Sequence, residues 1–163
     1  MIAEDEGWRL LVGSSAEMSA LGASLAVCLL PGIVIGLQGA LGAGKTTLVR
    51  GLIQSLGHSG RVKSPTYTLV ETYRAGDFHL HHFDLYRLSD PEELELMGVR
   101  DYFSPDAVCL VEWPERGTAV LPMMDVVVAL HYQGHRRLIK VRGDTPKGNH
   151  LLACWRRVVG SRA

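Results

Sequence analysis

One stretch of the chain combines residue types that together bind phosphate. Residues 39–47 read Gly-Ala-Leu-Gly-Ala-Gly-Lys-Thr-Thr, which has the spacing G-x-x-x-x-G-K-T of a P-loop. Its glycines let bare backbone approach a ligand, and the amide N–H groups converge at a helix N-terminus, where the helix dipole favours an anion. An apolar run at 33–37 precedes the loop and a helix-like run at 48–53 follows it. The sequence therefore predicts that nucleotide phosphates bind here.

The polar residues of this loop have distinct expected roles. Lys45 places an ammonium group between the β- and γ-phosphates, Thr46 offers its hydroxyl to Mg²⁺, and Thr47 is close enough to reach the α-phosphate. The remaining expected nucleotide contacts come from backbone groups of Gly39, Gly42, Ala43 and Gly44. A strand-to-helix connection that merely uses glycine is the alternative, and the Lys-Thr pair at the required offset argues against it.

Two acids are placed to serve this loop. A P-loop needs an acid that holds Mg²⁺ or its waters, and a group that orients the attacking water. Glu112 follows the apolar run 108–111, and Asp84 follows the run 80–83. We assign Glu112, together with Thr46, to the metal, and Asp84 to activation of water or to the waters around the metal. An acid that only caps a turn is the alternative for each.

Other polar residues near these motifs give weaker signals. Thr66 is a candidate switch residue for the γ-phosphate or Mg²⁺, with Ser64 beside it, and a turn hydroxyl bonded to backbone is the alternative. His79, His81 and His82 lie on an expected strand, whose alternation puts the first two on one face and His82 on the other. No further ligand cluster accompanies them, so we expect a solvated or partly packed strand.

The elements that must position these residues follow from local signals. Ser14 and Glu17 form a capping box at the start of a helix whose apolar positions recur as far as Leu29. Further helices are expected at 44–56, 90–97 and 147–158. Strands are expected at 33–37, 68–73, 78–83, 107–111, 126–130 and 138–141. Together they predict one α/β domain over residues 1–163, with the P-loop strand and the Glu112 strand as parallel neighbours near the centre and the hairpins as antiparallel additions.

Length and charge narrow the function classes. A chain of 163 residues, 47% of them hydrophobic, suffices for one domain with a buried core. The 17 basic and 17 acidic residues balance, so the chain lacks the overall positive charge that would indicate nucleic-acid binding. The acidic residues Glu4, Asp5 and Glu6 are unlike a signal peptide, and the apolar runs are too short to cross a membrane. We therefore expect a cytoplasmic protein.

The cysteines fit the same compartment. Cys28, Cys109 and Cys154 are far apart and odd in number, and each lies in an apolar run. No Cys-x-x-Cys pair indicates zinc. We therefore expect three buried, reduced thiols.

Four motifs in a fixed order carry a family resemblance. They are the P-loop at 39–47, the Ser-Pro-Thr segment at 62–70, the Asp-Leu-Tyr-Arg segment at 82–88 and the Glu-Trp-Pro segment at 110–114. Together they are similar to the bacterial TsaE (YjeE) family, and the segments 90–95 and 98–103 extend the match. The resemblance covers the chain from about Ser15 to Arg142, and the residues after Arg142 match no motif. The P-loop alone is generic, whereas the combination is specific.

The resemblance implies a fold, an activity and partners that composition does not show. The implied fold is a three-layer P-loop α/β sandwich with a mixed, mostly parallel sheet and antiparallel hairpin additions. The implied protein binds ATP and Mg²⁺ and hydrolyses ATP slowly alone. Its implied partner is the TsaB–TsaD heterodimer, where TsaD transfers a threonylcarbamoyl group to an adenosine in the tRNA anticodon loop. ATP hydrolysis would drive or reset that complex, and tRNA would be contacted only through it.

The resemblance also implies roles for individual residues. The lysine, threonine and two acids assigned above keep their roles in phosphate binding, metal binding and hydrolysis. Trp113 would lie beside the nucleotide, although an isolated tryptophan is more often part of a core. Arg137 matches an arginine near the adenine, with Arg136 leaving a second register open, and Ser15 would border the base.

The residues alone leave three other functions open. A small-molecule kinase usually needs an arginine-rich lid, whereas the segment 59–73 has only Arg61 and Lys63 as cations near the loop. A guanine-nucleotide switch would need an Asn-Lys-x-Asp motif, which does not occur. A binding module that uses nucleotide without catalysis is the third alternative.

Overall fold

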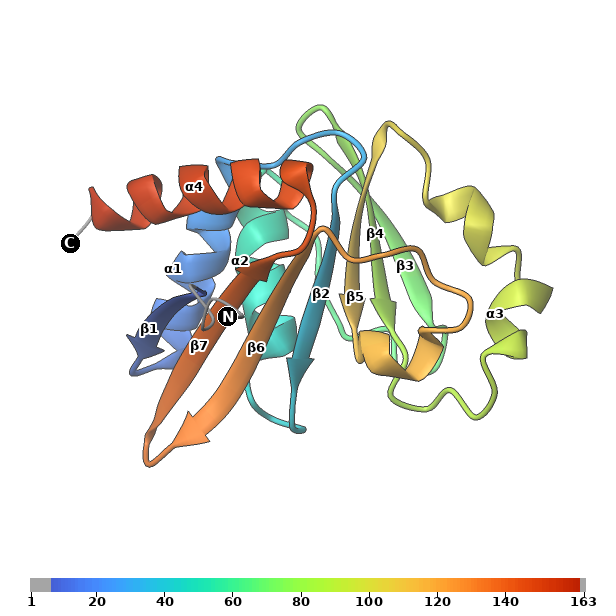
Figure 1. Ribbon diagram of the computed structural model, residues 1–163, viewed down its shortest axis with the longest axis horizontal. Helices are drawn as coiled ribbons and strands as arrows, with labels where there is room; N and C mark the ends of the chain where they lie inside the picture. Colours follow the sequence, from blue (N-terminus) through green and yellow to red (C-terminus); the bar gives the residue numbers. More distant parts are fainter. Residues whose placement is uncertain (1–6, 162–163) are drawn as a thin grey trace, which may run out of the picture.

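Seven strands form one mixed sheet at the centre of the computed structural model, which describes residues 7–161 (Figure 1). The strands are β1 (Trp8–Val12), β2 (Val34–Gly39), β3 (Val70–Ala75), β4 (Phe78–Asp84), β5 (Ala107–Glu112), β6 (Val126–Gln133) and β7 (Arg136–Gly143). Their order across the sheet is β1-β7-β6-β2-β5-β4-β3. Strand β2 pairs in parallel with both β5 and β6, and β5 pairs in parallel with β4. The predicted parallel pair of the P-loop strand and the Glu112 strand is therefore confirmed.

The two predicted hairpins each give one strand to this parallel core. The outer strand of each hairpin is antiparallel, β3 against β4 and β7 against β6, and β1 adds a further antiparallel edge beside β7. Strand β1 is absent from the predicted strands. It is only five residues long and lies at the edge of the sheet, so its stability depends on β7, which comes more than 100 residues later.

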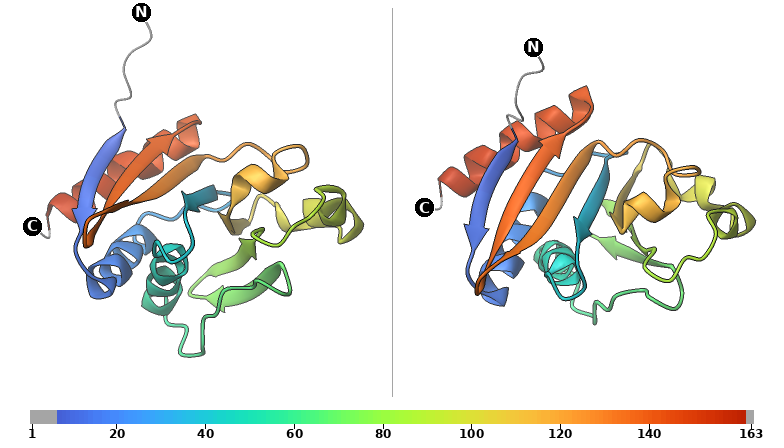
Figure 2. Two further views of the ribbon diagram at one scale, coloured as in Figure 1. Left: turned by 90° about the horizontal axis from the view of Figure 1, so that it is seen from below. Right: turned by 60° about the horizontal axis from the view of Figure 1, so that its bottom comes forward.

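Helices cover both faces of the sheet. They are α1 (Ser15–Ala26), α2 (Lys45–Ser55), α3 (Glu92–Leu96) and α4 (Pro146–Gly160), with short 3-10 helices η1 (Val99–Tyr102) and η2 (Pro114–Gly117). Figure 2 shows α1 and α2 on the side of the sheet away from α3. Buried side chains from α1, α2 and α4 form one core, and a smaller core lies between the sheet and α3, η1 and η2. The predicted three-layer sandwich is confirmed.

Local signals set the helix starts. Ser14 Oγ accepts from the Glu17 amide at 3.1 Å, and Glu17 accepts in turn from the Gly13 amide at 2.6 Å, so the predicted cap of α1 is confirmed. Helix α3 begins at Glu92, two residues after the predicted start at 90, and the Asp90 carboxylate accepts from the Glu92 amide at 2.9 Å in the turn that precedes the helix. Helix α4 begins with Pro146 in its first turn.

The expectations about the N-terminal residues, a membrane span and the number of domains are tested only in part. Residues Glu4, Asp5 and Glu6 lie outside the described residues. Within residues 7–161, no helix combines the length and apolar character that a membrane span requires. The assignment of residues 1–163 to a single domain stays a prediction.

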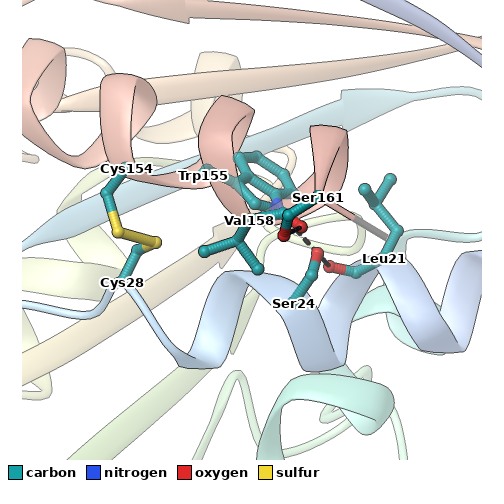
Figure 3. Close-up of a disulfide and its surroundings, with 7 residues drawn as sticks. All are labelled: Leu21, Ser24, Cys28, Cys154, Trp155, Val158 and Ser161. Carbon is teal, nitrogen blue, oxygen red and sulfur yellow. Dashed lines mark hydrogen bonds between the residues drawn. A yellow bond between two sulfur atoms is a disulfide. The ribbon is translucent and has the colours of Figure 1, made fainter. Parts of the chain in front are cut away.

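A disulfide joins Cys28, just after α1, to Cys154 in α4 (Figure 3), so the prediction of three reduced thiols is wrong. Their Cα atoms lie 5.8 Å apart although 126 positions separate them in the sequence. Sequence spacing gives no sign of this pairing, because only the docking of α4 on α1 creates it. The third thiol, on Cys109, is buried and free, and burial raises its pKa to about 12.

Helices α1 and α2 approach each other closely through two glycines. A Cβ atom on Gly22 would lie 2.0 Å from the carbonyl oxygen of Leu48, and one on Gly51 would lie 2.1 Å from that of Ser19. Both clashes involve backbone atoms, which cannot rotate away as a side chain does. This packing fixes α2, and with it the loop that precedes α2, against α1.

We expect Gly22→Ala to lower the free energy of unfolding by about 2 kcal/mol, because the helices must separate to admit the methyl group. Gly160→Ala is the matched control in α4, where an added Cβ meets no atom within 4 Å. The free energy of unfolding of the Gly160→Ala variant should be unchanged or up to about 1 kcal/mol higher, since alanine is a better helix former than glycine. Urea unfolding followed by circular dichroism measures both, and equal effects of the two substitutions would contradict the packing argument.

The disulfide predicts the number of reactive thiols. Protein purified without reductant and then denatured should show one thiol per chain, from Cys109, in a titration with a thiol reagent. After reduction it should show three. The Cys154→Ser variant should show two before reduction, because Cys28 loses its partner. Three thiols in the unreduced wild-type protein would show that the disulfide does not form.

Candidate active site

The candidate residues gather at the edge of the sheet where the parallel strands end. In the register of the sheet, Glu112 at the end of β5 lies between Leu37 of β2 and Asp84 of β4. The loop after β2 carries the P-loop, and α4 lies at the opposite end of the sheet (Figure 1). Ligands of open α/β sheets bind at this carboxyl edge. The fold therefore brings the predicted loop and both predicted acids together.

The P-loop has the conformation that its glycines predict. Gly39, Gly42 and Gly44 have φ angles of 150°, 77° and 111°, which lie in the region that side chains disfavour. Gly44 is the N-cap of α2, and no side chain caps its amide groups. These N–H groups are therefore available to an anionic ligand. Tyr132, on β6, holds the loop from outside by donating to the Leu41 carbonyl at 2.7 Å.

Lys45 lies inside this loop with 4% of its surface exposed. Its Nζ donates to the carbonyls of Gly39 and Ala40 at 2.5 and 3.0 Å. Burial lowers the pKa of Lys45, while the nearby carboxylates, Glu112 first among them, act in the opposite direction. The ammonium group also lies 4.6 Å from the centre of the Trp113 ring. The charge is thus surrounded by carbonyl oxygens, an aromatic face and acids rather than by water.

Thr46 and Glu112, the pair assigned to the metal, are in direct contact. The Thr46 hydroxyl lies 3.1 Å from each carboxylate oxygen of Glu112, which is 2% exposed. Magnesium is usually bound by one or two carboxylates, with waters and substrate phosphates completing its octahedron. One hydroxyl and one carboxylate beside a phosphate loop fit that donor set. Within residues 7–161, no group of three His, Cys, Asp or Glu could hold a metal ion by itself.

His82 completes the surroundings of Glu112. Its Nε2 lies 2.6 Å from Glu112 Oε2, and the residue is completely buried. The prediction of a solvated or partly packed strand is wrong at this position, although His79 is exposed and His81 half-buried on the opposite face, as alternation predicts. Burial lowers the pKa of His81, with His79 adding to the effect.

The predicted switch residues lie against Asp84. Ser64 donates a short hydrogen bond to Asp84 Oδ2, and Thr66 donates to the same oxygen at 3.3 Å. The other oxygen, Oδ1, accepts from the Tyr86 amide at 3.0 Å. The Ser-Pro-Thr segment is therefore attached to the acid at the end of β4. Thr66 contacts this acid, and its predicted role toward a γ-phosphate stays a prediction.

Trp113 directly follows Glu112 and has a left-handed backbone conformation with φ of 59°. Its amide donates to the Leu37 carbonyl at 3.1 Å, which ties this turn to the P-loop strand. Its ring contacts the Tyr86 ring, with centroids 5.1 Å apart, and the Arg116 guanidinium lies 5.3 Å from each ring. Trp113 therefore lies beside Lys45, on the phosphate side of the loop.

A cavity of about 210 Å³ opens on the α1 side of the P-loop. Its lining comes from the loop, from the start of α1 and from the β6–β7 hairpin: Val12, Gly13, Ser14, Ser15, Met18, Gly42, Ala43, Gly44, Thr47, His135 and Arg137. The structure thus brings the predicted base-side residues Ser15 and Arg137 to one cavity. The Arg137 guanidinium lies 4.1 Å from the Tyr132 ring. Arg136 is exposed at the start of β7 and does not line the cavity.

His82, Tyr132 and His135 are among the site residues that were not predicted. His82 had a usable signal, because Asp84 is two positions away and residues i and i+2 of a strand share a face. Tyr132 and His135 lie in a hairpin that becomes a neighbour of the P-loop only through the pairing of β6 with β2. No local pattern in the sequence marks them.

The parallel sheet, the glycine loop and the acids at the ends of β4 and β5 define a protein of the P-loop class. Residues 12–139 match the model of one family, described as threonylcarbamoyl adenosine biosynthesis protein TsaE. The chain belongs to the TsaE family, and the resemblance found in the motifs is confirmed.

Individual relatives agree with this assignment. The tRNA threonylcarbamoyladenosine biosynthesis protein TsaE of Haemophilus influenzae is 51% identical over 123 residues, which is 76% of this chain and 78% of the relative. The protein of the same description from Bacillus subtilis is 37% identical over 127 residues, 78% of each chain. The crystal structure of YdiB from Bacillus subtilis superposes with a TM-score of 0.80 at 27% identity, covering 93% of this chain and 95% of that one.

Proposed function

We propose that this protein is a Mg²⁺-dependent ATPase that acts in the threonylcarbamoyladenosine modification of tRNA, on a TsaB–TsaD complex. One observation carries the proposal: Thr46 of the P-loop meets Glu112 at 3.1 Å, with Asp84 on the adjacent strand. A phosphate loop, a metal-binding pair and a second acid are the parts that ATP hydrolysis requires. Membership of the TsaE family supplies the pathway.

The loop binds the polyphosphate with its backbone. The uncapped N–H groups at the start of α2 donate to phosphate oxygens, and Lys45 exchanges the carbonyls of Gly39 and Ala40 for the β- and γ-phosphates. The cavity beside Ser15 and Arg137 takes the base. Thr46 and Glu112 are the protein groups that would hold Mg²⁺, which would supply positive charge to neutralise the charge that develops on the phosphate oxygens.

Asp84 orients the attacking water. Its carboxylate is held at one oxygen by the Tyr86 amide and at the other by Ser64 and Thr66. Because both hydroxyls belong to the segment between α2 and β3, movement of that segment would change the partners of Asp84. This arrangement couples the catalytic acid to a surface loop, where a partner protein can act on it.

The productive chemistry on tRNA is assigned to the partner. The overall charge of zero gives this chain no broad field for RNA, so it reaches tRNA through the TsaB–TsaD complex. ATP hydrolysis then drives or resets the turnover of that complex. The cytoplasm, where tRNA is modified, is the proposed location.

Phosphate release from ATP should be slow for the purified protein and should rise when purified TsaB–TsaD is added. Threonylcarbamoyladenosine formation on tRNA should require this chain, and Lys45→Ala should support neither reaction. The proposed function is wrong if TsaB–TsaD does not stimulate phosphate release and forms threonylcarbamoyladenosine equally well without this chain. Transfer of the γ-phosphate to a small acceptor, in place of release, would indicate the kinase alternative.

Glu112→Gln should weaken nucleotide binding in Mg²⁺ by about tenfold or more and leave binding in EDTA nearly unchanged, because the amide keeps the side-chain shape but is a poor ligand for Mg²⁺. Glu93→Gln is the control, since Glu93 is an exposed carboxylate on α3. Calorimetric titration with ADP under both conditions gives the two affinities. An equal loss with and without Mg²⁺ would remove Glu112 from the metal role.

A further inference from the structure

His82 is a buried polar side chain that the proposed reaction does not use. The residue has 0% exposure, and its Nε2 lies 2.6 Å from Glu112 Oε2. Its other ring nitrogen, Nδ1, has no hydrogen-bond partner. Among the buried side-chain nitrogen and oxygen atoms of residues 7–161, it is the one atom without a partner. Burying an imidazole with half of its hydrogen-bonding capacity unused costs free energy. An apolar residue would pack on this strand without that cost.

The hydrogen bond has a fixed direction. A carboxylate oxygen only accepts, so Nε2 donates to Glu112, while Nδ1 has no partner among the described residues. Leu80, two positions earlier on the same face of β4, is completely buried in the core under α2. The imidazole therefore projects from a packed strand and has little freedom to turn. It is a rigid donor aimed at one oxygen of one acid.

Glu112 needs such a partner because its side chain has three rotatable bonds. One contact comes from Thr46 on α2, whose hydroxyl is 3.1 Å from both oxygens. The other comes from His82 on β4 and reaches only Oε2. Two donors on two elements hold a carboxylate in one orientation, whereas Thr46 alone leaves it free to pivot about the shared contact.

We propose that His82 is a positioning residue: it holds the Glu112 carboxylate in the orientation that, with the Thr46 hydroxyl, receives Mg²⁺. The inference rests on the proposed Mg²⁺-dependent binding of nucleotide. Hydrogen bonds to ligating carboxylates tune metal affinity in this way, and losing one typically costs 10- to 100-fold in metal affinity or activity. A residue that serves only packing would affect folding and leave the response to Mg²⁺ unchanged.

Three substitutions separate these roles. In glutamine the side-chain amide nitrogen is four bonds from Cα, as Nε2 is in histidine, so His82→Gln keeps a donor within reach of Glu112. In asparagine the nitrogen is one bond nearer the backbone, so His82→Asn stays polar without reaching the acid. His82→Leu is apolar and of similar size. His79→Gln is the control, because His79 is exposed on the other face of the same strand.

The experiment measures the affinity of each full-length variant for a fluorescent ADP analogue, in EDTA and over a series of Mg²⁺ concentrations, with a urea midpoint for each. In wild-type protein Mg²⁺ should tighten binding. In His82→Leu and His82→Asn, the Mg²⁺ concentration that produces half of the increase in affinity should rise by about tenfold or more. The affinity for the analogue in EDTA should be unchanged. His82→Gln and His79→Gln should behave like the wild type.

Each other outcome overturns a distinct claim. If wild-type binding does not respond to Mg²⁺, the proposed function is wrong and this inference fails with it. If the wild type responds and His82→Leu and His82→Asn respond equally well, only the inference fails. A loss in His82→Gln as large as in His82→Asn, or an equal loss in EDTA and in Mg²⁺, would show that packing rather than the hydrogen bond is responsible. Should His82→Leu not fold, the comparison of Gln with Asn decides alone.

Discussion

The register of β5 between its two parallel neighbours is the constraint on which the site depends. It places Glu112 beside Leu37, at the end of the P-loop strand, and beside Asp84. Side chains alternate along a strand, so a slip of one residue would turn Glu112 to the opposite face, away from Thr46. The distances among loop, hydroxyl and acids follow from this register.

The packing of β5 protects that register. All six of its residues are buried, with Val108 and Leu110 in the core under α2 and Cys109 and Val111 in the core under α3. A one-residue slip would exchange the two sets and place the Glu112 carboxylate among apolar side chains, where burying an unpaired charge costs several kcal/mol. The apolar contacts that stabilise the sheet therefore also position the acid.

The parts of this site that could be predicted were those that local residue types define. The P-loop, the caps and the acids after apolar strands depend on residues within a few positions of each other, and the structure places them together. Strand β1, the Cys28–Cys154 disulfide and the contact of Tyr132 with the loop depend on pairings across 90 residues or more. His82 lies between these cases. Alternation along the strand predicted which face of the sheet it occupies, but its contact with Glu112 depends on the register of β4 against β5.

The C-terminal segment, which matched no motif, supports the P-loop strand from its other end. Asp125, just before β6, is the connection: its Oδ2 accepts from the Val34 amide at the start of β2 at 2.8 Å, and its Oδ1 accepts from the Thr145 hydroxyl at 2.6 Å. Thr145 is in turn the N-cap of α4 and accepts from the Gly148 amide at 3.0 Å.

Further along α4, Leu151 and Trp155 are completely buried in the core, and Trp155 donates to Ser24 of α1 at 2.8 Å. Helix α4 is thus attached both to the start of β2 and to α1, the helix that packs against α2. Since β2 and α2 flank the P-loop, α4 fixes the loop's two supports relative to each other without approaching the loop. The part of the chain beyond residue 139, where the family match ends, therefore contributes to the site through the fold and not through chemistry.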